Sequence, residues 1–262
     1  MGIAVTRVVF ITGASSGIGR ATALACAKAG YHVVGTARRA ARLDALAQEI
    51  DQLESDHGDF LAIAGDVRDA DALQTAVAQT VDRFGRLDVL IANAGVGHRG
   101  AFVDSDWDEI ETLLRVNIDG VLHSVRFAVP EMRKSGGGHV ITISSIAYNL
   151  VSPNAAVYAA SKAFVTSMAN SLRLELANDD IYVTDFLLGR TETEFNSSRL
   201  GEGARKASSL PVMPAEQVAD AIVDVIQNPR PKLTLRPIDR LIVLANRLFP
   251  NVVGWFAKRE YR

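Results

Sequence analysis

The sequence holds a single cysteine, Cys26, which leaves no partner within the chain for a disulfide bond. Small secreted domains commonly depend on several disulfides, so the cysteine content gives no indication of an oxidising compartment. Long hydrophobic runs are missing as well, because no apolar stretch reaches the ~18 residues that a membrane-spanning helix needs. Residues 1–10 contain an arginine and lead straight into a glycine-rich turn, without the apolar core of a signal peptide. We therefore expect a cytoplasmic protein.

An excess of charge of one sign is also missing. Lysine and arginine total 28 and aspartate and glutamate total 30, which gives a net charge of -2 at pH 7. Such a chain has no overall positive field to attract nucleic acid, so we expect no nucleic-acid partner. The 5 histidines are scattered, and no carboxylate–histidine spacing recurs, so we expect no metal site.

The sequence is rich in apolar residues, and short apolar runs alternate regularly with helical patterns. Its 262 residues are 48% hydrophobic, enough for a large core, and length alone permits one large domain or two small ones. Strands are expected at 8–11, 32–36, 60–64, 88–92, 139–144, 181–188 and 232–235, with helices at 18–29, 40–53, 69–84, 106–132, 155–177 and 214–227. This alternation predicts right-handed βαβ units and an α/β fold. We expect one doubly wound parallel sheet of about seven strands in a single domain, residues 1–262.

Two segments depart from this rhythm. Residues 191–211 are weakly patterned and rich in glycine, serine and charge, which is typical of a mobile segment that covers a substrate. Residues 238–262 mix apolar pairs such as Trp255-Phe256 with lysine and arginine. A basic amphipathic tail of this kind can lie on a membrane surface, cover a second subunit or pack against its own domain. Packing against protein is the expected use, and membrane contact the less expected one.

A glycine-rich loop lies between the first strand and the first helix. It reads Thr12-Gly13-Ala14-Ser15-Ser16-Gly17-Ile18-Gly19. Glycines let the backbone approach a ligand closely, and the helix start offers free N–H groups and a positive dipole end, which together suit a pyrophosphate. The spacing is neither the general G-x-G-x-x-G fingerprint nor a Walker loop. A tight strand-to-helix turn without a ligand is the alternative for the glycines taken alone.

Further motifs follow the loop in a fixed order. They are Asp66-Val67 after the third expected strand, Asn93-Ala94-Gly95 after the fourth, Asn117 within a helix, Ser145 at the end of the fifth strand, and Tyr158-Ala159-Ala160-Ser161-Lys162. Together with the T-G-x-x-x-G-x-G loop, this set resembles the short-chain dehydrogenase/reductase family over roughly residues 5–195. The resemblance implies a Rossmann-type fold, a nicotinamide cofactor and hydride transfer to or from a substrate carbon.

The same resemblance implies roles for individual residues. The cofactor would be bound by Gly13, Ser15, Ser16, Gly17, Ile18, Gly19, Arg38, Asp66, Val67, Asn93, Ala94, Gly95, Tyr158, Lys162 and Thr193. Tyr158 would exchange a proton with the substrate oxygen, Ser145 would hold that oxygen, and Lys162 would lower the tyrosine pKa and hold the nicotinamide ribose. Asn117 would hold a water that relays protons. Relatives pair their two long helices into a homodimer or homotetramer, and we expect a homo-oligomer here, with a dimer slightly favoured.

The pairing of tyrosine with lysine has a physical reason. Tyr158 and Lys162 are four residues apart, so on a helix they share one face. Bringing a tyrosine from a pKa of about 10 to near 7 requires roughly 4 kcal/mol. A lysine charge ~4 Å away supplies about that much at an effective dielectric constant of 20.

The end of the second strand bears on which nicotinamide cofactor is used. It reads Gly35-Thr36-Ala37-Arg38-Arg39, without the acid that would take the ribose hydroxyls of NAD. Arg38 offers a fork of donors suited to the 2′-phosphate of NADP. We therefore predict NADP, with NAD less favoured. The alternative is that Arg38 and Arg39 only solvate the start of a helix.

Two positions depart from the family pattern. Leu188-Gly189 replaces the usual Pro-Gly after the sixth strand, and Tyr148 stands where a glycine is common. Tyr148 either narrows the pocket or is a surface aromatic.

These observations predict an NADP(H)-dependent oxidoreductase that interconverts a carbonyl and a secondary alcohol on a small or lipid-like molecule. One alternative is an acyl-thioester or sugar oxidoreductase of the same family. Another is a non-catalytic NADP-binding regulatory protein, although such a protein would be free to lose one of Ser145, Tyr158 and Lys162. Hydrolysis by Ser145 is disfavoured because this serine does not lie in a G-x-S-x-G elbow.

Overall fold

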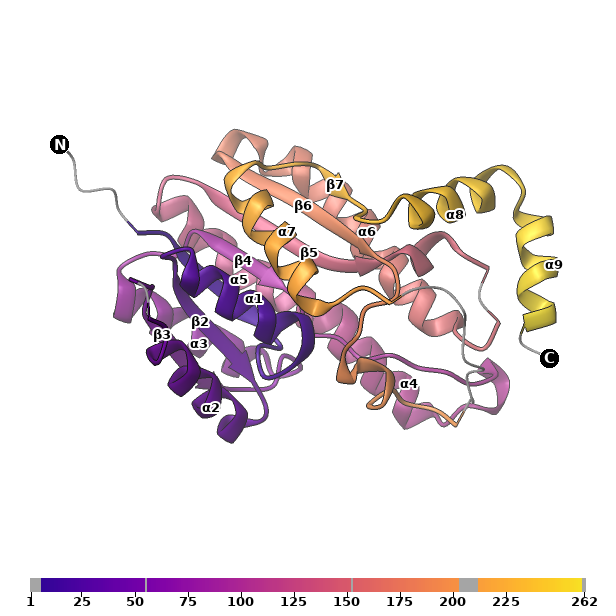
Figure 1. Ribbon diagram of the computed structural model, residues 1–262, viewed down its shortest axis with the longest axis horizontal. Helices are drawn as coiled ribbons and strands as arrows, with labels where there is room; N and C mark the ends of the chain where they lie inside the picture. Colours follow the sequence, from indigo (N-terminus) through magenta and orange to yellow (C-terminus); the bar gives the residue numbers. More distant parts are fainter. Residues whose placement is uncertain (1–5, 55, 152, 203–211, 261–262) are drawn as a thin grey trace.

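The protein folds around one parallel β-sheet. The computed structural model describes residues 6–54, 56–151, 153–202 and 212–260. Its strands are β1 (Val8–Thr12), β2 (His32–Ala37), β3 (Phe60–Ala64), β4 (Val89–Ala92), β5 (Gly138–Ser145), β6 (Ile181–Leu188) and β7 (Lys232–Leu233). They pair in the order β3-β2-β1-β4-β5-β6-β7, and every pair is parallel (Figure 1). The predicted fold class, a doubly wound sheet of about seven strands, is confirmed.

Helices cover both faces of the sheet. One face carries α1 (Gly17–Lys28), α2 (Ala40–Asp51) and α7 (Ala215–Gln227), and the other carries α3 (Ala70–Phe84), α5 (Gly120–Lys134) and α6 (Ala156–Glu175). Residues alternate along β1 between the two cores: Val9 and Ile11 join one, whereas Val8 and Phe10 join the other. All four are fully buried, as expected for a strand packed on both sides.

The strand order creates a crevice at one edge of the sheet. The chain runs outward from β1 through β2 to β3 and then returns to β4 on the opposite side of β1. Where the order reverses, the connections after β1 and β4 leave on opposite faces and a crevice opens at the carboxyl ends of the strands. The glycine loop follows β1, and Asn93-Ala94-Gly95 follows β4, so both motifs line this crevice.

The long helix expected at 106–132 is interrupted. The structure has α4 (Trp107–Leu114), a π-helical turn at Arg115–Asp119, and then α5. The backbone N–H of Gly120 donates to the carbonyl of Arg115, five residues back, which marks the wider turn. Isolated π-turns inside helices occur frequently at functional sites, and this one contains Asn117.

The C-terminal segment forms two helices, α8 (Pro237–Leu248) and α9 (Pro250–Glu260), which extend beyond the sheet (Figure 1). α8 rests on the short 3-10 helix η3 (Ile146–Asn149), where Asn149 Nδ2 donates to the carbonyl of Val243 at 3.3 Å. Among the described residues, no helix is both long and apolar enough to cross a bilayer. Residues 203–211 of the segment expected to cover the substrate, and residues 261–262 of the tail, lie outside the described residues.

Candidate active site

The glycine loop forms a backbone cradle at the start of α1. Gly17 has φ 52°, a left-handed conformation that suits glycine. At Gly19, an added Cβ would lie 2.3 Å from the carbonyl oxygen of Gly13, so only glycine fits. No side chain caps the first N–H groups of α1 and no acid lies in its first turn. A cradle of this kind fits the pyrophosphate of a dinucleotide.

Asn93 fastens this cradle to the neighbouring strand. Its side-chain Nδ2 donates to the carbonyl of Thr12 at 2.8 Å and to that of Gly13 at 3.3 Å. The backbone N–H of Ala94 donates to Thr12 Oγ1 at 3.0 Å. Because these bonds join the ends of β1 and β4, Asn93 fixes the shape of the loop in addition to lining the pocket.

Two arginines follow β2, and their side chains make different contacts. Arg39 donates to Ser15 Oγ from Nε and Nη2, at 3.2 and 3.1 Å, and to Ser16 Oγ from Nη2 at 2.7 Å. Its Nη1 donates to Glu194 Oε2 at 3.1 Å. Arg38 is exposed and lines the same pocket. The interaction between Arg39 and the loop serines was not predicted, because it joins segments that the sequence separates by more than 20 residues.

Asp66 and Val67 form the wall beside Arg38. Arg68 Nη2 donates to Asp66 Oδ2 at 2.7 Å. Partial burial raises the pKa of Asp66, but the hydrogen bonds of Arg68 outweigh it, and the charge of Arg38 adds to the net lowering. Val67 is buried, and its Cγ2 would lie 2.7 Å from a Cβ added to Gly120 at the start of α5.

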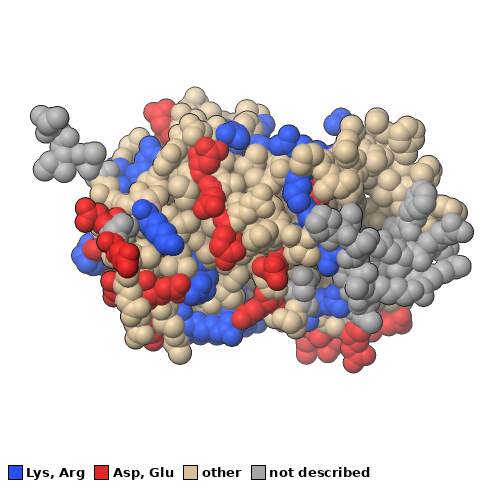
Figure 2. Space-filling view, in the orientation of Figure 1, with Lys and Arg blue, Asp and Glu red and all other residues tan. Residues whose placement is uncertain are grey.

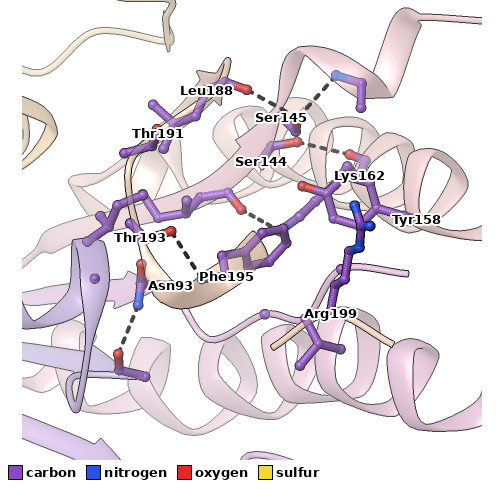
Figure 3. A pocket seen from close by; sticks show the side chains of 18 of the residues that line it. Asn93, Ser144, Ser145, Tyr158, Lys162, Leu188, Thr191, Thr193, Phe195 and Arg199 are labelled. Carbon is purple, nitrogen blue, oxygen red and sulfur yellow. Dashed lines mark hydrogen bonds between the residues drawn. The ribbon is translucent and has the colours of Figure 1, made fainter. Parts of the chain in front are cut away.

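One pocket of about 690 Å³ joins the cradle to the catalytic candidates. Its lining includes every residue for which cofactor contact was predicted, except the buried Gly19, and it includes Ser145, Tyr158 and Lys162. Asn117 does not line it. Figure 3 shows the end of this pocket at which Ser145, Tyr158 and Lys162 meet.

Ser145 ends β5 and is held in place by its neighbours. Its Oγ donates to the carbonyl of Leu188 at 3.1 Å and accepts from the backbone N–H of Ala147 at 3.2 Å (Figure 3). Burial raises the pKa of Tyr158, and the nearby Ser145 hydroxyl only partly offsets the rise. The structure therefore favours the neutral phenol, whereas the tyrosine–lysine pairing alone predicts a lowered pKa.

Lys162 is buried one helical turn from Tyr158. Its Nζ donates to the carbonyl of Ile143 at 2.8 Å. Burial lowers the pKa of Lys162 to about 8, although the charge of Asp185 acts to raise it. Because a lysine with this pKa is partly neutral at mildly alkaline pH, it exerts less pull on the phenolate than a full charge would.

Asp185 was missed by the sequence interpretation. It lies in the middle of β6, is 1% exposed, and accepts a hydrogen bond from Thr142 Oγ1 at 2.8 Å. Burial raises the pKa of Asp185, while the hydrogen bonds of Thr142 and Thr166 and the charges of two lysines oppose the rise. The sequence could have revealed Asp185, because it is an acid within a strand predicted to be buried. A buried carboxylate needs a compensating partner, so such a position indicates a specific contact.

Asn117 is fully buried, and its amide is committed to protein groups. Its Oδ1 accepts from the backbone N–H of Val96 at 2.8 Å, and its Nδ2 donates to the Val96 carbonyl and to Ser161 Oγ, both at 3.0 Å. The side chain thus joins the π-turn to the loop after β4 and to α6. Holding a relay water stays a prediction for this residue.

Several described residues of the segment 191–211, called the lid below, line the pocket. Thr193 packs on the glycine loop, where its Cγ2 would lie 2.9 Å from a Cβ on Gly17. Phe195 contacts Tyr158 at 5.8 Å between ring centroids, and Arg199 points towards Tyr158 (Figure 3). The backbone N–H of Leu200 donates to the Gly97 carbonyl at 2.8 Å, which ties the lid to the loop after β4.

Glu194 provides the other attachment of the lid. Its carboxylate accepts from Arg42 Nη1 at 2.8 and 2.7 Å in addition to Arg39. The hydrogen bonds of Arg42 and Arg39 lower the pKa of Glu194. Glu194 lies more than 150 positions from Arg39 and Arg42 in the sequence, so no local sequence pattern could predict these contacts.

The α8 helix also reaches the pocket. Arg236 Nη2 lies 2.7 Å from Asp239 Oδ1, and this pair packs on Gly189, where a Cβ would lie 2.3 Å from both side chains. Ile242 of α8 and Val253 of α9 line the pocket. Tyr148 instead lines a second groove, whose walls are residues of η3 and α8 together with Thr234. In the described part of the chain, no group of three His, Cys, Asp or Glu residues is arranged to hold a metal ion.

Comparison with known proteins identifies the family. The family model described as short chain dehydrogenase matches residues 7–202. Sulfoacetaldehyde reductase of Chromohalobacter salexigens is 36% identical over 224 residues, which are 82% of this chain and 86% of that protein.

Two solved structures show the same architecture. An alcohol dehydrogenase from Thermococcus sibiricus, complexed with 5-hydroxy-NADP, has 25% identity and a TM-score of 0.78, covering 89% of this chain and 97% of its own. A 3-ketoacyl-(acyl-carrier-protein) reductase from Brucella melitensis, complexed with NADH, has 29% identity and a TM-score of 0.76, covering 84% and 90%. With its fold, its motifs and these relatives taken together, the chain belongs to the short-chain dehydrogenase family of oxidoreductases.

Proposed function

We propose that the protein is an NADP(H)-dependent reductase that converts a carbonyl to a secondary alcohol, using Ser145, Tyr158 and Lys162. The observation that carries this proposal is the meeting of Ser145, Tyr158 and Lys162 in the pocket that begins at the glycine loop, with Lys162 one helical turn from Tyr158 (Figure 3). A panel of aldehydes and ketones, followed by NADPH absorbance, tests it. The proposal fails if NADPH binds but no carbonyl in the panel is reduced.

The dinucleotide would lie along the pocket. The backbone of residues 13–19 would hold its pyrophosphate, Asp66 and Val67 its adenine end, and Thr193 its carboxamide. When bound, the cofactor supplies the hydride. NADP is favoured because Arg38 and Arg39 stand at the adenosine end and the segment after β2 has no acid. The relatives do not decide this point, since one solved structure holds an NADP derivative and the other NADH.

The side chains would handle the proton. Ser145 and Tyr158 would both donate to the carbonyl oxygen, which orients the substrate and polarises its double bond. Tyr158 would then pass its proton to the developing alkoxide. The raised pKa of Tyr158 keeps this proton in place at neutral pH, which supports reduction as the working direction. Lys162, anchored to the Ile143 carbonyl, would hold the ribose and share positive charge with the tyrosine.

The pH dependence should differ between the two directions. Reduction needs the phenol, so its rate at saturating NADPH should stay flat between about pH 6 and 7, below both the ordinary tyrosine pKa and the pKa of about 8 of Lys162. Oxidation of the alcohol needs the phenolate, so its rate should rise as pH increases over the same range. Steady-state rates in both directions measure this. A reduction rate that falls between about pH 6 and 7 would assign the proton to a group with a lower pKa than tyrosine.

Glu194 should oppose the phosphate of NADP. Its carboxylate contacts Arg39 and Arg42, so a 2′-phosphate bound near these arginines would meet a negative charge. We expect Glu194→Gln to tighten NADPH binding severalfold, in line with about 1 kcal/mol for charges a few ångströms apart in water, and to leave NADH affinity unchanged. Fluorescence titration of both cofactors measures the two affinities.

Glu192→Gln is the matched control, because Glu192 is exposed in the same segment and has no described contact with Arg39 or Arg42. It should leave both affinities unchanged. Weaker NADPH binding in Glu194→Gln would mean that Glu194 orients Arg39 towards the phosphate and does not compete with it.

A further inference from the structure

The C-terminal helices expose a continuous apolar surface. Leu241, Leu244 and Leu248 recur at helical spacing on α8 and are 60%, 50% and 60% exposed. The surface continues past the end of α8 through Phe249, Val252 and Trp255, each more than half exposed. In the view of Figure 2, the region over α8 is formed largely by uncharged residues. Apolar side chains gathered in this way mark a surface that contacts something else.

Positive charge predominates in the same two helices. Arg240, Arg247, Lys258 and Arg259 are accompanied by only two acids, Asp239, which is buried against Arg236, and Glu260 at the end of α9, although the whole chain has a net charge of -2. The side chains of Lys258, Arg259 and Glu260 are not among those described. Arg240 and Arg247 are seven residues apart, so both lie on the face of α8 that also carries Leu244.

A groove lies between these arginines. It has a volume of about 440 Å³ and is lined by Tyr148, Asn149, Thr234, Arg240, Val243, Leu244 and Arg247, with no acid among them. Arg240 is held by a hydrogen bond from its Nε to the carbonyl of Thr234 at 2.9 Å. Two guanidinium groups and a phenol around one groove, beside exposed leucines, are suited to the phosphate of a lipid whose acyl chains lie against the leucines.

We propose that α8 and α9 dock the protein on an anionic lipid surface, with a lipid phosphate in the groove of Arg240 and Arg247. A second copy of this chain fits the surface less well, because a two-fold contact places the same basic face against itself. Leucine, tryptophan and arginine together on one amphipathic face are typical of helices that lie in a membrane interface. This interpretation reverses the order of the sequence expectation, in which membrane contact ranked below protein packing.

The docking surface is continuous with the catalytic pocket. Ile242 and Val253 line that pocket, while Leu241 and Val252, their neighbours in the chain, are exposed on the surface. Docking therefore places one wall of the pocket next to the lipid. If the proposed reductase activity holds, the substrate class that fits this arrangement is an apolar carbonyl compound dissolved in the membrane. The docking itself does not depend on that activity.

Vesicle binding tests the proposal directly. The full chain is mixed with vesicles of phosphatidylcholine alone or with added phosphatidylglycerol, and bound protein is measured by sedimentation, with Trp255 fluorescence as a second readout. We expect binding to the anionic vesicles only, and less of it as salt rises. Arg240→Gln with Arg247→Gln should weaken binding roughly tenfold to thirtyfold. Leu244→Glu should abolish binding.

Matched controls remove the same groups elsewhere. Lys28→Gln with Lys134→Gln removes two exposed positive charges, and Leu174→Glu alters a leucine on α6 that is 74% exposed. Both controls should bind vesicles as the wild type does. NADPH titration of every variant shows that each is folded, and it tests cofactor binding separately from docking.

Three results would overturn the proposal. Equal binding to neutral and anionic vesicles would exclude a headgroup site. Failure of the wild type to bind either vesicle would exclude lipid docking. A dimer in sedimentation that Leu244→Glu converts to monomer, without vesicle binding, would assign the surface to a second copy.

Discussion

Tyr158→Phe should lower kcat for carbonyl reduction by roughly 10²–10⁴-fold, the contribution of a general acid. The substitution removes only the phenolic hydroxyl and keeps the ring that contacts Phe195. The pocket lining between the glycine loop and Thr193 is untouched, so the dissociation constant of NADPH should stay within a few-fold of the wild-type value. A large loss of turnover with unchanged NADPH affinity would show that the variant is folded and that the substitution removes a catalytic group.

Tyr182→Phe is the control, because Tyr182 is exposed on β6 and does not line the pocket. It should retain the wild-type rate. If Tyr158→Phe also retained a comparable rate on the same carbonyl, proton transfer would have to be assigned to another group.

Arg38→Asp should reverse the cofactor preference. The wild type should bind NADPH roughly tenfold to a hundredfold more tightly than NADH, since each charge-assisted bond to the phosphate is worth about 1.5–3 kcal/mol before losses to solvent. The substitution removes a donor and places a negative charge where the phosphate would lie. We expect NADH to become the preferred cofactor, with the change mostly in Kd. Titration of both reduced cofactors into wild type and variant measures it.

A variant of Arg39 distinguishes recognition of the 2′-phosphate from support of the glycine loop. It already bonds to Ser15, Ser16 and Glu194, so Arg39→Gln should disturb the loop and lower affinity for both cofactors. Arg83→Asp, on an exposed arginine of α3 outside the pocket, should change neither affinity. Equal affinities in the wild type, or an Arg38→Asp variant that still prefers NADPH, would show that Arg38 does not recognise the phosphate. Arg39 would then be the next candidate.

The fold could be predicted because its determinants are local. A solid apolar run such as Val8 to Ile11 indicates a strand buried on both faces, and the glycines after it indicate the turn into α1. The catalytic candidates could be found for the same reason, since Tyr158 and Lys162 lie one turn apart on one helix. Sequence spacing predicts a contact correctly when both residues belong to one helix or strand, or when they lie at the ends of adjacent strands.

The remaining features depend on contacts between distant segments. Asn117, within the π-turn, bonds to Val96 and Ser161, and helical periodicity does not indicate these contacts. The raised pKa of Tyr158 follows from burial that its neighbours in the sequence do not reveal. The part that α8 plays in the pocket depends on the packing of Asp239 against Gly189, two residues that are 50 positions apart.

The most direct test of the central claim is transfer of the hydrogen itself. NADPH carrying deuterium at both C4 positions is incubated with wild-type enzyme and a carbonyl from the reductase panel, and the alcohol is analysed by mass spectrometry. The account predicts one deuterium on the former carbonyl carbon, faster transfer from NADPH than from NADH, and roughly 10²–10⁴-fold less labelled alcohol in the same time with Tyr158→Phe. An alcohol formed without deuterium, or as much labelled alcohol in that time with Tyr158→Phe as with the wild type, would contradict it.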